Sequence, residues 1–287
     1  MAHIISVGGP NSIGATNPFT TSSVFRTQSL CVTPVEFLDG NGVDSGKLGT
    51  GFFWRHEGKT FLITNWHNVS GKNPFDFELL DPTTAFVPAK FQIFLPRAVG
   101  NESSFAPLGR VAHEVTLYAD FNEPLWLEHP EFERLRVDVV AIPLDGVNLS
   151  AEFHVNAHQS LELFNLVGAD VFVVGYPFKN YTGIALPIWK RGSFATEPIW
   201  PIDGKPMFLI DAATRPGMSG APIFRHQLGP ATTVDRTIHA GNIVTTQFIG
   251  VYSGHIGDSL QQLGIGFGWY GSLVDEIIHS SKLGGRH

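Results

Sequence analysis

A serine in a glycine-flanked turn is the residue best placed for chemistry in this sequence. The run DAATRPGMSGAPIF puts Ser219 between Met218 and Gly220, directly before an apolar segment that is typical of a strand. Small residues let neighbouring backbone N–H groups point at one spot, where a tetrahedral intermediate develops its negative oxygen. Gly217 and Ser219 are the natural donors of such an oxyanion hole. An ordinary polar turn could have the same sequence, so the segment alone leaves both interpretations open.

A serine hydroxyl is a weak nucleophile and needs a neighbouring base to take its proton. Among the 12 histidines, His67 follows the apolar run TFLITN and opens the short turn WHNVSG. Its imidazole is therefore expected at the end of a strand. His56, in the polar loop RHEGK, and His113, in the middle of VAHEV, are interpreted as a surface residue and a strand residue. The sequence thus predicts His67 as the base.

An acid beside the base holds the imidazole in one tautomer and stabilises the imidazolium. Asp138 enters the apolar run VDVVAIPL, where burial of a carboxylate without a partner is costly, so a partner is expected. The alternative to a catalytic role is an ion pair with Arg134 or Arg136. Three other aspartates remain rivals, although none begins an apolar strand in the same way: Asp76, Asp120 and Asp145.

The elements that must position these residues are short apolar runs bounded by turn residues, in two series. The first is CVTPVEF, GTGFFW, TFLITN, AKFQIFL, RVAHEVTLY and VDVVAIPL; the second is DVFVVGYPF, GIALPIW, MFLIDA, APIF, NIVTTQFIGVYSG and LGIGFGW. No helix alternates regularly with these strands, which argues against a doubly wound fold and favours an all-β protein. The segment YGSLVDEIIHSSK predicts a C-terminal amphipathic helix with one apolar face: Leu273, Val274, Ile277 and Ile278.

These segments predict five parts: an N-terminal arm (1–27), a first lobe (28–145), a crossover (146–166), a second lobe (167–270) and a C-terminal helix and tail (271–287). In the crossover, His154 and His158 have the helical i, i+4 spacing that could hold zinc. A surface pair of histidines is the favoured interpretation. The metalloprotease motif HExxH is absent, and neither a metal nor a cofactor is expected.

Composition sets limits on partners and location. The 287 residues are 43% hydrophobic and 16% charged, with a net charge of −7 and scattered Lys and Arg, so no nucleic-acid partner is expected. No run is long enough to span a bilayer, and no basic leader precedes an apolar run near Met1. A cytoplasmic protein without membrane contact is therefore expected. The single cysteine, Cys31, is expected to be a small buried hydrophobe that forms no intramolecular disulfide.

Taken in order, several motifs resemble those of trypsin-like serine peptidases, most closely of their bacterial HtrA-like (Do-like) branch. They are LGTGFFW, FLITNWHNV, VDVVAIPL, VGYPF, IDAATRPGMSGAPIF, and FIGVYSG followed by LGIGFGW and a helix. The resemblance covers about residues 47 to 281. It implies a chymotrypsin-like all-β fold of two six-stranded antiparallel β-barrels with a C-terminal α-helix. It also implies a serine endopeptidase with the triad His67, Asp138 and Ser219.

Two departures from the family accompany this resemblance. The 71 residues from His67 to Asp138 exceed the family's usual spacing, so an insertion is expected in the first lobe at about residues 72–130. No PDZ domain is expected after residue 287.

By the resemblance, the primary substrate pocket lies between the segment before the nucleophile and one strand. Its lining would be Ala213 and Thr214 on one side, and Val251, Tyr252, Ser253 and Gly254 on the other. No acidic residue stands at Ala213 to pair a buried cation, so a small or medium apolar P1 residue is expected. The expected partner is a protein or peptide substrate, and a regulatory partner or oligomeric state stays unassigned.

Two other functions compete with this prediction. The first is an α/β-hydrolase esterase that recruits Ser219, Asp258 and His279. Its nucleophile elbow requires G-x-S-x-G followed by a helix, whereas Ala221 replaces the last glycine and the following Pro-Ile-Phe indicates a strand. The second is a catalytically inactive trypsin-like pseudoenzyme that acts as a peptide-binding module. The complete triad argues against it.

Overall fold

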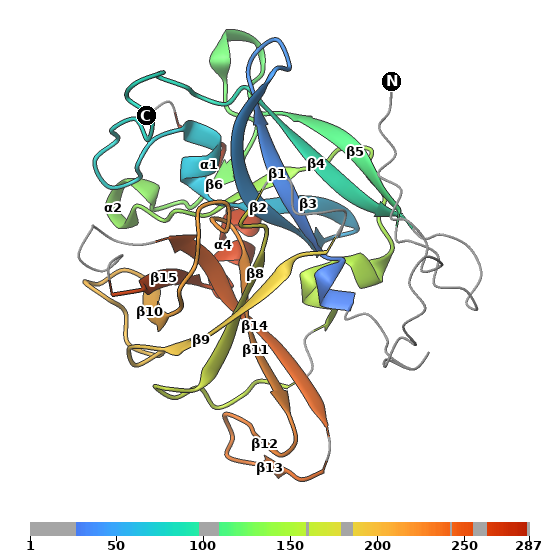
Figure 1. The fold of residues 1–287 in the computed structure, drawn as a ribbon, viewed down its shortest axis with the longest axis vertical. Coiled ribbons are helices and arrows are strands. Elements are labelled where there is room, and N and C mark those ends of the chain that lie inside the picture. Colours follow the sequence, from blue (N-terminus) through green and yellow to red (C-terminus); the bar gives the residue numbers. More distant parts are fainter. Residues whose placement is uncertain are drawn as a thin grey trace, which may run out of the picture.

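Figure 1 shows the fold in a computed structural model, which describes residues 27–97, 109–158, 161–178, 186–241, 243–254 and 263–285. The strands gather into two bodies, with the blue-to-green strands above and the yellow-to-red strands below in Figure 1. Nearly all of the predicted N-terminal arm falls outside the described residues. No helix in the described ranges is long and apolar enough to cross a membrane.

Seven strands from the first half of the chain form the upper sheet, in the order β5-β4-β1-β2-β3-β7-β6. They are β1 (Val32–Leu38), β2 (Asp44–His56), β3 (Lys59–Thr64), β4 (Lys90–Arg97), β5 (Gly109–Thr116), β6 (Leu127–Glu128) and β7 (Val140–Pro143).

The hairpin of β2 and β3 illustrates why these residues form strands. Its two-residue turn is Glu57-Gly58, with φ values of 47° and 77°, and positive φ at both central positions matches the twist of the flanking strands. Along β2, Phe52 and Trp54 face the core between the two sheets, while Phe53 faces the core of the upper sheet. This is the two-residue alternation of a strand that is buried on both faces. The hairpin carries the chain to the end of β3, just before His67.

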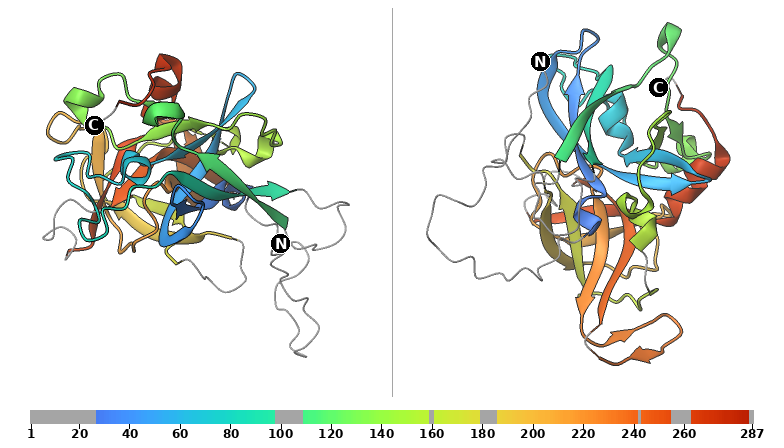
Figure 2. Two further views of the ribbon diagram at one scale, coloured as in Figure 1. Left: turned by 90° about the horizontal axis from the view of Figure 1, so that it is seen from above. Right: turned by 90° about the vertical axis from the view of Figure 1, so that its right-hand side faces the viewer.

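The lower body is a closed six-stranded barrel in the order β10-β15-β14-β11-β8-β9. Its strands are β8 (Asp170–Gly175), β9 (Ile188–Phe194), β10 (Met207–Asp211), β11 (Pro222–Leu228), β14 (Val244–Gly254) and β15 (Ile265–Tyr270). A separate small hairpin projects from the outer ends of β11 and β14, at the bottom of Figure 1 and of the right view in Figure 2; it consists of β12 (Ala231–Thr232) and β13 (Ile238–His239). One closed barrel of the expected kind is therefore present.

The second closed barrel expected from the sequence is not confirmed. Within the described residues, β5 and β6 are the two edges of the upper sheet and do not pair with each other. The C-terminal tail covers the β6 edge instead: Leu283 bridges Leu127, and the Glu128 N–H donates to the Lys282 carbonyl at 3.0 Å. Because β6 has only two residues and the tail occupies its free edge, it cannot continue the ladder to β5.

The range 72–130, where an insertion is predicted, includes strands of the upper sheet. It contains β4, β5 and β6, which are members of the upper sheet, and β4 pairs with β1. An irregular loop from Gly71 to Ala89 precedes β4.

The expected C-terminal helix is present as α4 (Ser272–Ser280), and its four predicted core positions are all buried. They belong to the core cluster between the two sheets. Two short α-helices belong to the upper body: α1 (Trp66–Ser70) follows β3, and α2 (Phe132–Leu135) lies between β6 and β7. The 3-10 segments are η1 (Thr27–Ser29), η2 (Asp120–Asn122), η3 (Ala151–Phe153) and η4 (Val155–His158).

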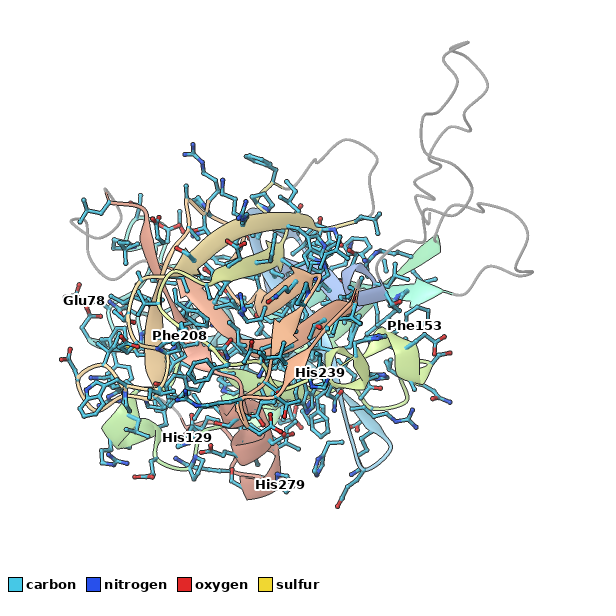
Figure 3. All side chains as sticks on the ribbon, turned by 90° about the horizontal axis from the view of Figure 1, so that it is seen from below. Glu78, His129, Phe153, Phe208, His239 and His279 are labelled. Atoms are coloured by element: carbon cyan, nitrogen blue, oxygen red, sulfur yellow. The ribbon has the colours of Figure 1, made fainter. Side chains whose placement is uncertain are left out.

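The α/β-hydrolase alternative is wrong. Every pair of named strands in the described ranges is antiparallel, whereas that fold needs a mostly parallel sheet between helices. His279 lies on α4 at the margin of the molecule in Figure 3, with Nδ1 2.6 Å from the Asp275 carbonyl oxygen. Asp258 lies outside the described residues.

Two expectations about single residues have opposite outcomes. Cys31 is fully buried as expected, and burial raises the pKa of its thiol. The interpretation of His154 as a surface residue is wrong, because it is 0% exposed. Its Nε2 lies 3.1 Å from Thr60 Oγ1, and burial lowers its pKa. His158 is half-buried, and its Nε2 lies 2.5 Å from the Glu152 carbonyl oxygen.

Candidate active site

His67 and Asp138 meet at the ends of two neighbouring strands. β3 pairs with β7 so that Thr64 lies opposite Val140. His67 follows β3 in the first turn of α1, and Asp138 precedes β7. Gly71, in the left-handed conformation at φ 68°, ends α1 and donates its N–H to the His67 carbonyl at 3.0 Å. The strand pairing thus brings together two residues that are far apart in the chain.

The contact between His67 and Asp138 has two hydrogen bonds. His67 Nδ1 lies 2.6 Å from Asp138 Oδ2, and the His67 backbone N–H donates to Asp138 Oδ1 at 2.8 Å. A carboxylate oxygen only accepts, so this contact places the ring proton on Nδ1 and leaves Nε2 as an acceptor. The Asp138 side chain is 1% exposed and the His67 side chain 14%. The imidazole therefore reaches solvent while its partner does not.

Further donors surround Asp138. The Ser253 hydroxyl donates to Asp138 Oδ2, and the Asn65 side-chain amide donates to the Asp138 carbonyl at 2.6 Å. The Ser253 bond, together with the two bonds from His67, offsets the loss of hydration of the buried Asp138 carboxylate. Ser253 was predicted as a pocket residue, and the structure places its hydroxyl on Asp138. Sequence reasoning missed this contact because it joins β14 of the barrel to the upper sheet.

The arginine alternative for Asp138 does not match the structure. Arg134 Nη2 pairs with Glu131 at 2.5 Å, and Arg136 Nη1 pairs with Glu133 at 3.2 Å. The rival aspartates are also engaged elsewhere or exposed: Asp76 Oδ2 accepts from Asn73, Asp120 begins η2, and Asp145 is exposed.

The rival histidines lie on other elements. His56 ends β2, and its ring packs against that of His279 at a centroid distance of 4.5 Å. His113 lies inside β5, opposite Ile93. Of the three histidines considered, only His67 contacts Asp138.

Ser219 lies in a turn that the upper body anchors. Its carbonyl oxygen accepts from the Thr50 N–H at 2.8 Å and from the Asn68 side-chain amide at 3.2 Å. Thr50 belongs to β2, and Asn68 is the residue after His67 on α1. The barrel's serine turn is thereby tied to the helix that carries the histidine. Sequence analysis did not assign Thr50 or Asn68, and their only signal is polarity inside apolar segments.

The glycines of this turn have positive φ angles, which are unfavourable for residues with a side chain. Gly217 has φ 95° and Gly220 has φ 87°. A Cβ on Gly220 would collide with the Thr50 carbonyl oxygen. Among the described residues, no acceptor is bonded to the N–H of Gly217 or of Ser219. The two predicted oxyanion-hole donors are therefore uncommitted.

The residues predicted to line the pocket have different surroundings. Ala213 is exposed, Thr214 is half-buried, and the Thr214 hydroxyl is hydrogen-bonded to the Tyr252 hydroxyl. Gly254, at φ 112°, ends β14. Val251 is fully buried in the core between the sheets. Burial raises the pKa of Tyr252 to about 12, so this phenol is neutral at ordinary pH.

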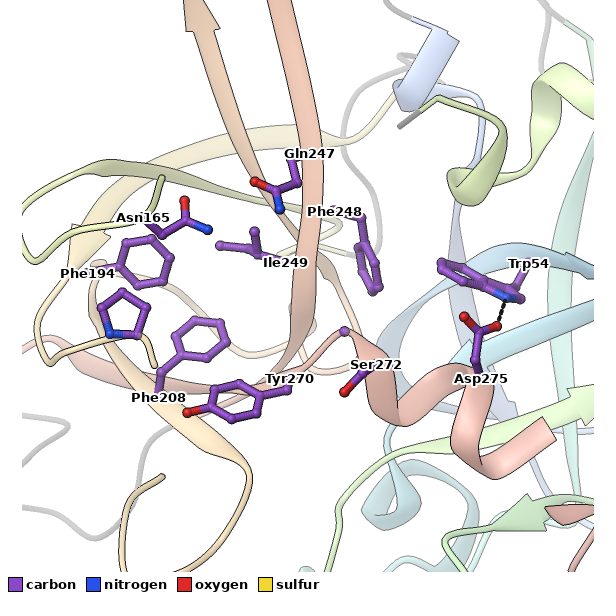
Figure 4. A pocket seen from close by; sticks show the side chains of 12 residues that line it. Trp54, Asn165, Phe194, Phe208, Gln247, Phe248, Ile249, Tyr270, Ser272 and Asp275 are labelled. Atoms are coloured by element: carbon purple, nitrogen blue, oxygen red, sulfur yellow. Dashed lines mark hydrogen bonds between the residues drawn. The ribbon is translucent and has the colours of Figure 1, made fainter. Parts of the chain in front are cut away.

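A separate cavity of about 320 Å³ lies away from these residues, beside β14 and the start of α4 (Figure 4). Its walls include Phe194, Phe208 and Tyr270, and at its edge Trp54 donates to Asp275 at 3.0 Å. None of the triad candidates lines it. In the ranges that the structure describes, no group of three or more His, Cys, Asp or Glu side chains could hold a metal ion.

A family model described as a trypsin-like peptidase domain matches residues 49–229. No curated protein matches the sequence.

Several solved structures are similar to the chain. The Rv3671c protease from M. tuberculosis, in its active form, is 18% identical over 91% of this chain and 83% of its own, with a TM-score of 0.42. The HtrA-type protease AlgW with a tripeptide is 16% identical over 88% and 60%, with a TM-score of 0.46. The protease Anisep from Arthrobacter nicotinovorans is 16% identical over 85% and 91%, with a TM-score of 0.46.

Proposed function

The chain belongs to the trypsin-like peptidase family, and we propose that it is a serine endopeptidase whose triad is His67, Asp138 and Ser219. The observation that carries the proposal is the two-bond contact of His67 with Asp138, which orients Nε2 as the acceptor. The bond from Asn68 to the Ser219 carbonyl supports it, because it fixes the serine turn against the same helix.

The proposed reaction begins when Ser219 Oγ attacks the carbonyl carbon of a peptide bond and His67 Nε2 takes the hydroxyl proton. The negative oxygen of the tetrahedral intermediate accepts from the N–H groups of Gly217 and Ser219. Asp138 stabilises the imidazolium through Nδ1. The imidazolium then gives its proton to the leaving amine, which departs and leaves an acyl-enzyme on Ser219. Water, deprotonated by His67, hydrolyses the ester and restores the serine.

Several finer statements form part of the proposal. The substrate is a protein or peptide with a small or medium apolar P1 residue, since Ala213 offers no negative charge. The two lobes correspond to residues 28–145 and 167–270, joined by a crossover at 146–166. Support for this division comes from strand pairing, because β1–β7 and β8–β15 pair only within their own sets in the described chain. A cytoplasmic location and the absence of nucleic-acid and membrane partners stay predictions.

The alternative is an inactive family member that binds peptides without cleaving them. A fluorophosphonate probe separates the two, because it reacts with an activated serine and not with an ordinary surface hydroxyl. We expect a single adduct in the intact mass, mapped to Ser219 by peptide sequencing and lost in His67→Ala. An unmodified protein that still binds peptides would favour the inactive alternative.

A further inference from the structure

The side chain of Tyr252 lies directly beside the serine turn. Two main-chain bonds fix its position: the Gly220 N–H donates to the Tyr252 carbonyl at 2.9 Å, and the Tyr252 N–H donates to the Ala221 carbonyl at 2.8 Å. The next residue, Ser253, contacts Asp138. Tyr252 is therefore the last residue of β14 before the strand reaches the acid of the proposed triad.

The Tyr252 ring crosses from β14 to two other segments. Its hydroxyl is hydrogen-bonded to Thr214, five residues before Ser219. On the other side the ring lies against Gly266 of β15, where a Cβ would stand 2.6 Å from Tyr252 Cε2 and 2.8 Å from its hydroxyl oxygen. A glycine is thus needed at 266 to make room for the phenol. The ring spans the space between the segment before the nucleophile and β15.

The barrel core leaves no room for this ring to retreat. Tyr252 is 1% exposed and belongs to a cluster of buried side chains. Its neighbours in the cluster come from β10, β11 and the serine turn, and they include Ile210, Met218 and Ile223. Interiors packed in this way do not admit an added side chain without displacing one that is present.

We propose that Tyr252 determines the P1 specificity of the enzyme by closing the pocket beside Ser219, so that only Gly, Ala or Ser fits as P1. This inference rests on the proposed function. The predicted P1 pocket lies between the segment of Ala213 and Thr214 and the end of β14, and the Tyr252 ring, whose hydroxyl reaches Thr214, fills that passage. A longer P1 side chain would have to push the ring toward Gly266, against which it already lies.

Two variants separate the effect of the Tyr252 ring's volume from the effect of its hydrogen bond. Tyr252→Phe removes the bond to Thr214 and keeps the ring, whereas Tyr252→Val removes the ring. If volume decides P1, the phenylalanine variant keeps the wild-type preference and the valine variant accepts larger residues. Tyr270→Val is the matched control, since Tyr270 lies on β15 and lines the separate cavity in Figure 4.

The experiment measures kcat/KM for peptides that differ only at P1, which is Gly, Ala, Val, Leu or Phe. For the wild type we expect kcat/KM to fall by roughly 10-fold or more at each step from Ala to Val, Leu and Phe. The reason is that a pocket wall discriminates by about 10–200-fold per methylene. For Tyr252→Val we expect Leu to gain at least about 10-fold relative to Ala. Tyr252→Phe and Tyr270→Val should keep the wild-type order.

Each outcome decides the inference. A wild type that cleaves after Leu or Phe as fast as after Ala overturns it, and this result needs no variant to fold. An unchanged order in a folded Tyr252→Val protein, checked by circular dichroism, also overturns it. Failure of the proposed function is distinguishable, because then no peptide is cleaved and the fluorophosphonate leaves Ser219 unmodified.

Discussion

Asp138 receives hydrogen bonds from the His67 ring, the His67 backbone and the Ser253 hydroxyl, and each bond has a different consequence. The ring bond fixes the tautomer of His67. The backbone bond fixes the distance between α1 and the start of β7. The Ser253 bond ties the acid to β14 of the barrel. The proposed acid is thus held by both bodies of the protein.

Asp138→Asn tests the role of this carboxylate. An asparagine can hydrogen-bond to His67 in either amide orientation, so it no longer enforces a proton on Nδ1. We expect kcat to fall about 10⁴-fold with little loss of stability. The control is Asp145→Asn, at an exposed aspartate that was a rival candidate, and it should leave kcat unchanged. Equal losses of kcat in both variants would contradict the proposed role of Asp138 as the acid of the triad.

At the scale of elements, the serine turn depends on close approach between β2 and residues 217–220. Thr50 donates its N–H to the Ser219 carbonyl and its hydroxyl to the Gly217 carbonyl at 2.7 Å. The turn can lie this near only because Gly220 lacks a side chain. Strand β2 therefore fixes the position of the serine turn and is also a member of the upper sheet.

Gly220→Ala is expected to cost stability and nearly all activity. The new methyl group would meet the Thr50 carbonyl and would also be strained at φ 87°. Gly229→Ala is the matched control, because Gly229 has φ 107° and no heavy atom within 4 Å of its added Cβ. Strain alone is worth about 1–3 kcal/mol, so urea unfolding should show a larger loss for Gly220→Ala than for the control. Similar losses would mean that the contact with β2 is unimportant.

On the scale of the whole molecule, one hydrophobic core joins the upper sheet to the lower barrel, although no strand of the one pairs with a strand of the other in the described chain. Phe248 of β14 packs against Phe52 and Trp54 of β2, with ring centroids 5.4 and 5.3 Å apart. The buried face of α4 belongs to the same cluster. Because the proposed triad draws residues from both bodies, this core also maintains the site.

Phe248→Ala should destabilise the protein by about 3–5 kcal/mol, the usual cost of removing a buried phenylalanine. Tryptophan fluorescence and far-ultraviolet circular dichroism should still report one transition in urea, because the two bodies share the core. Phe178→Ala, at a side chain that is 54% exposed, should change stability by less than about 0.5 kcal/mol. Two separate transitions in Phe248→Ala would show that the bodies unfold independently.

Local patterns predicted the parts of this structure that depend on local sequence. The two series of strands, the apolar face of α4 and the positions of His67 and Asp138 at strand ends follow from turn residues and periodicity. Contacts that depend on long-range register were missed. The docking of residues 282–284 on β6 keeps the upper sheet open at that edge, and the bond from Ser253 to Asp138 crosses between the bodies. His154 was misjudged because its buried partner, Thr60, is 94 residues away.

The central claim is that Ser219 and His67 act as one catalytic unit, and a double-mutant cycle tests it most directly. The measurement is kcat on a single peptide for Ser219→Ala, His67→Ala and the double variant, each shown to be folded. We expect each single change to cost on the order of 10⁴–10⁶-fold and the double change to cost no more than either one. Losses that multiply in the double variant, or a Ser219→Ala protein within tenfold of the wild type, would contradict the account.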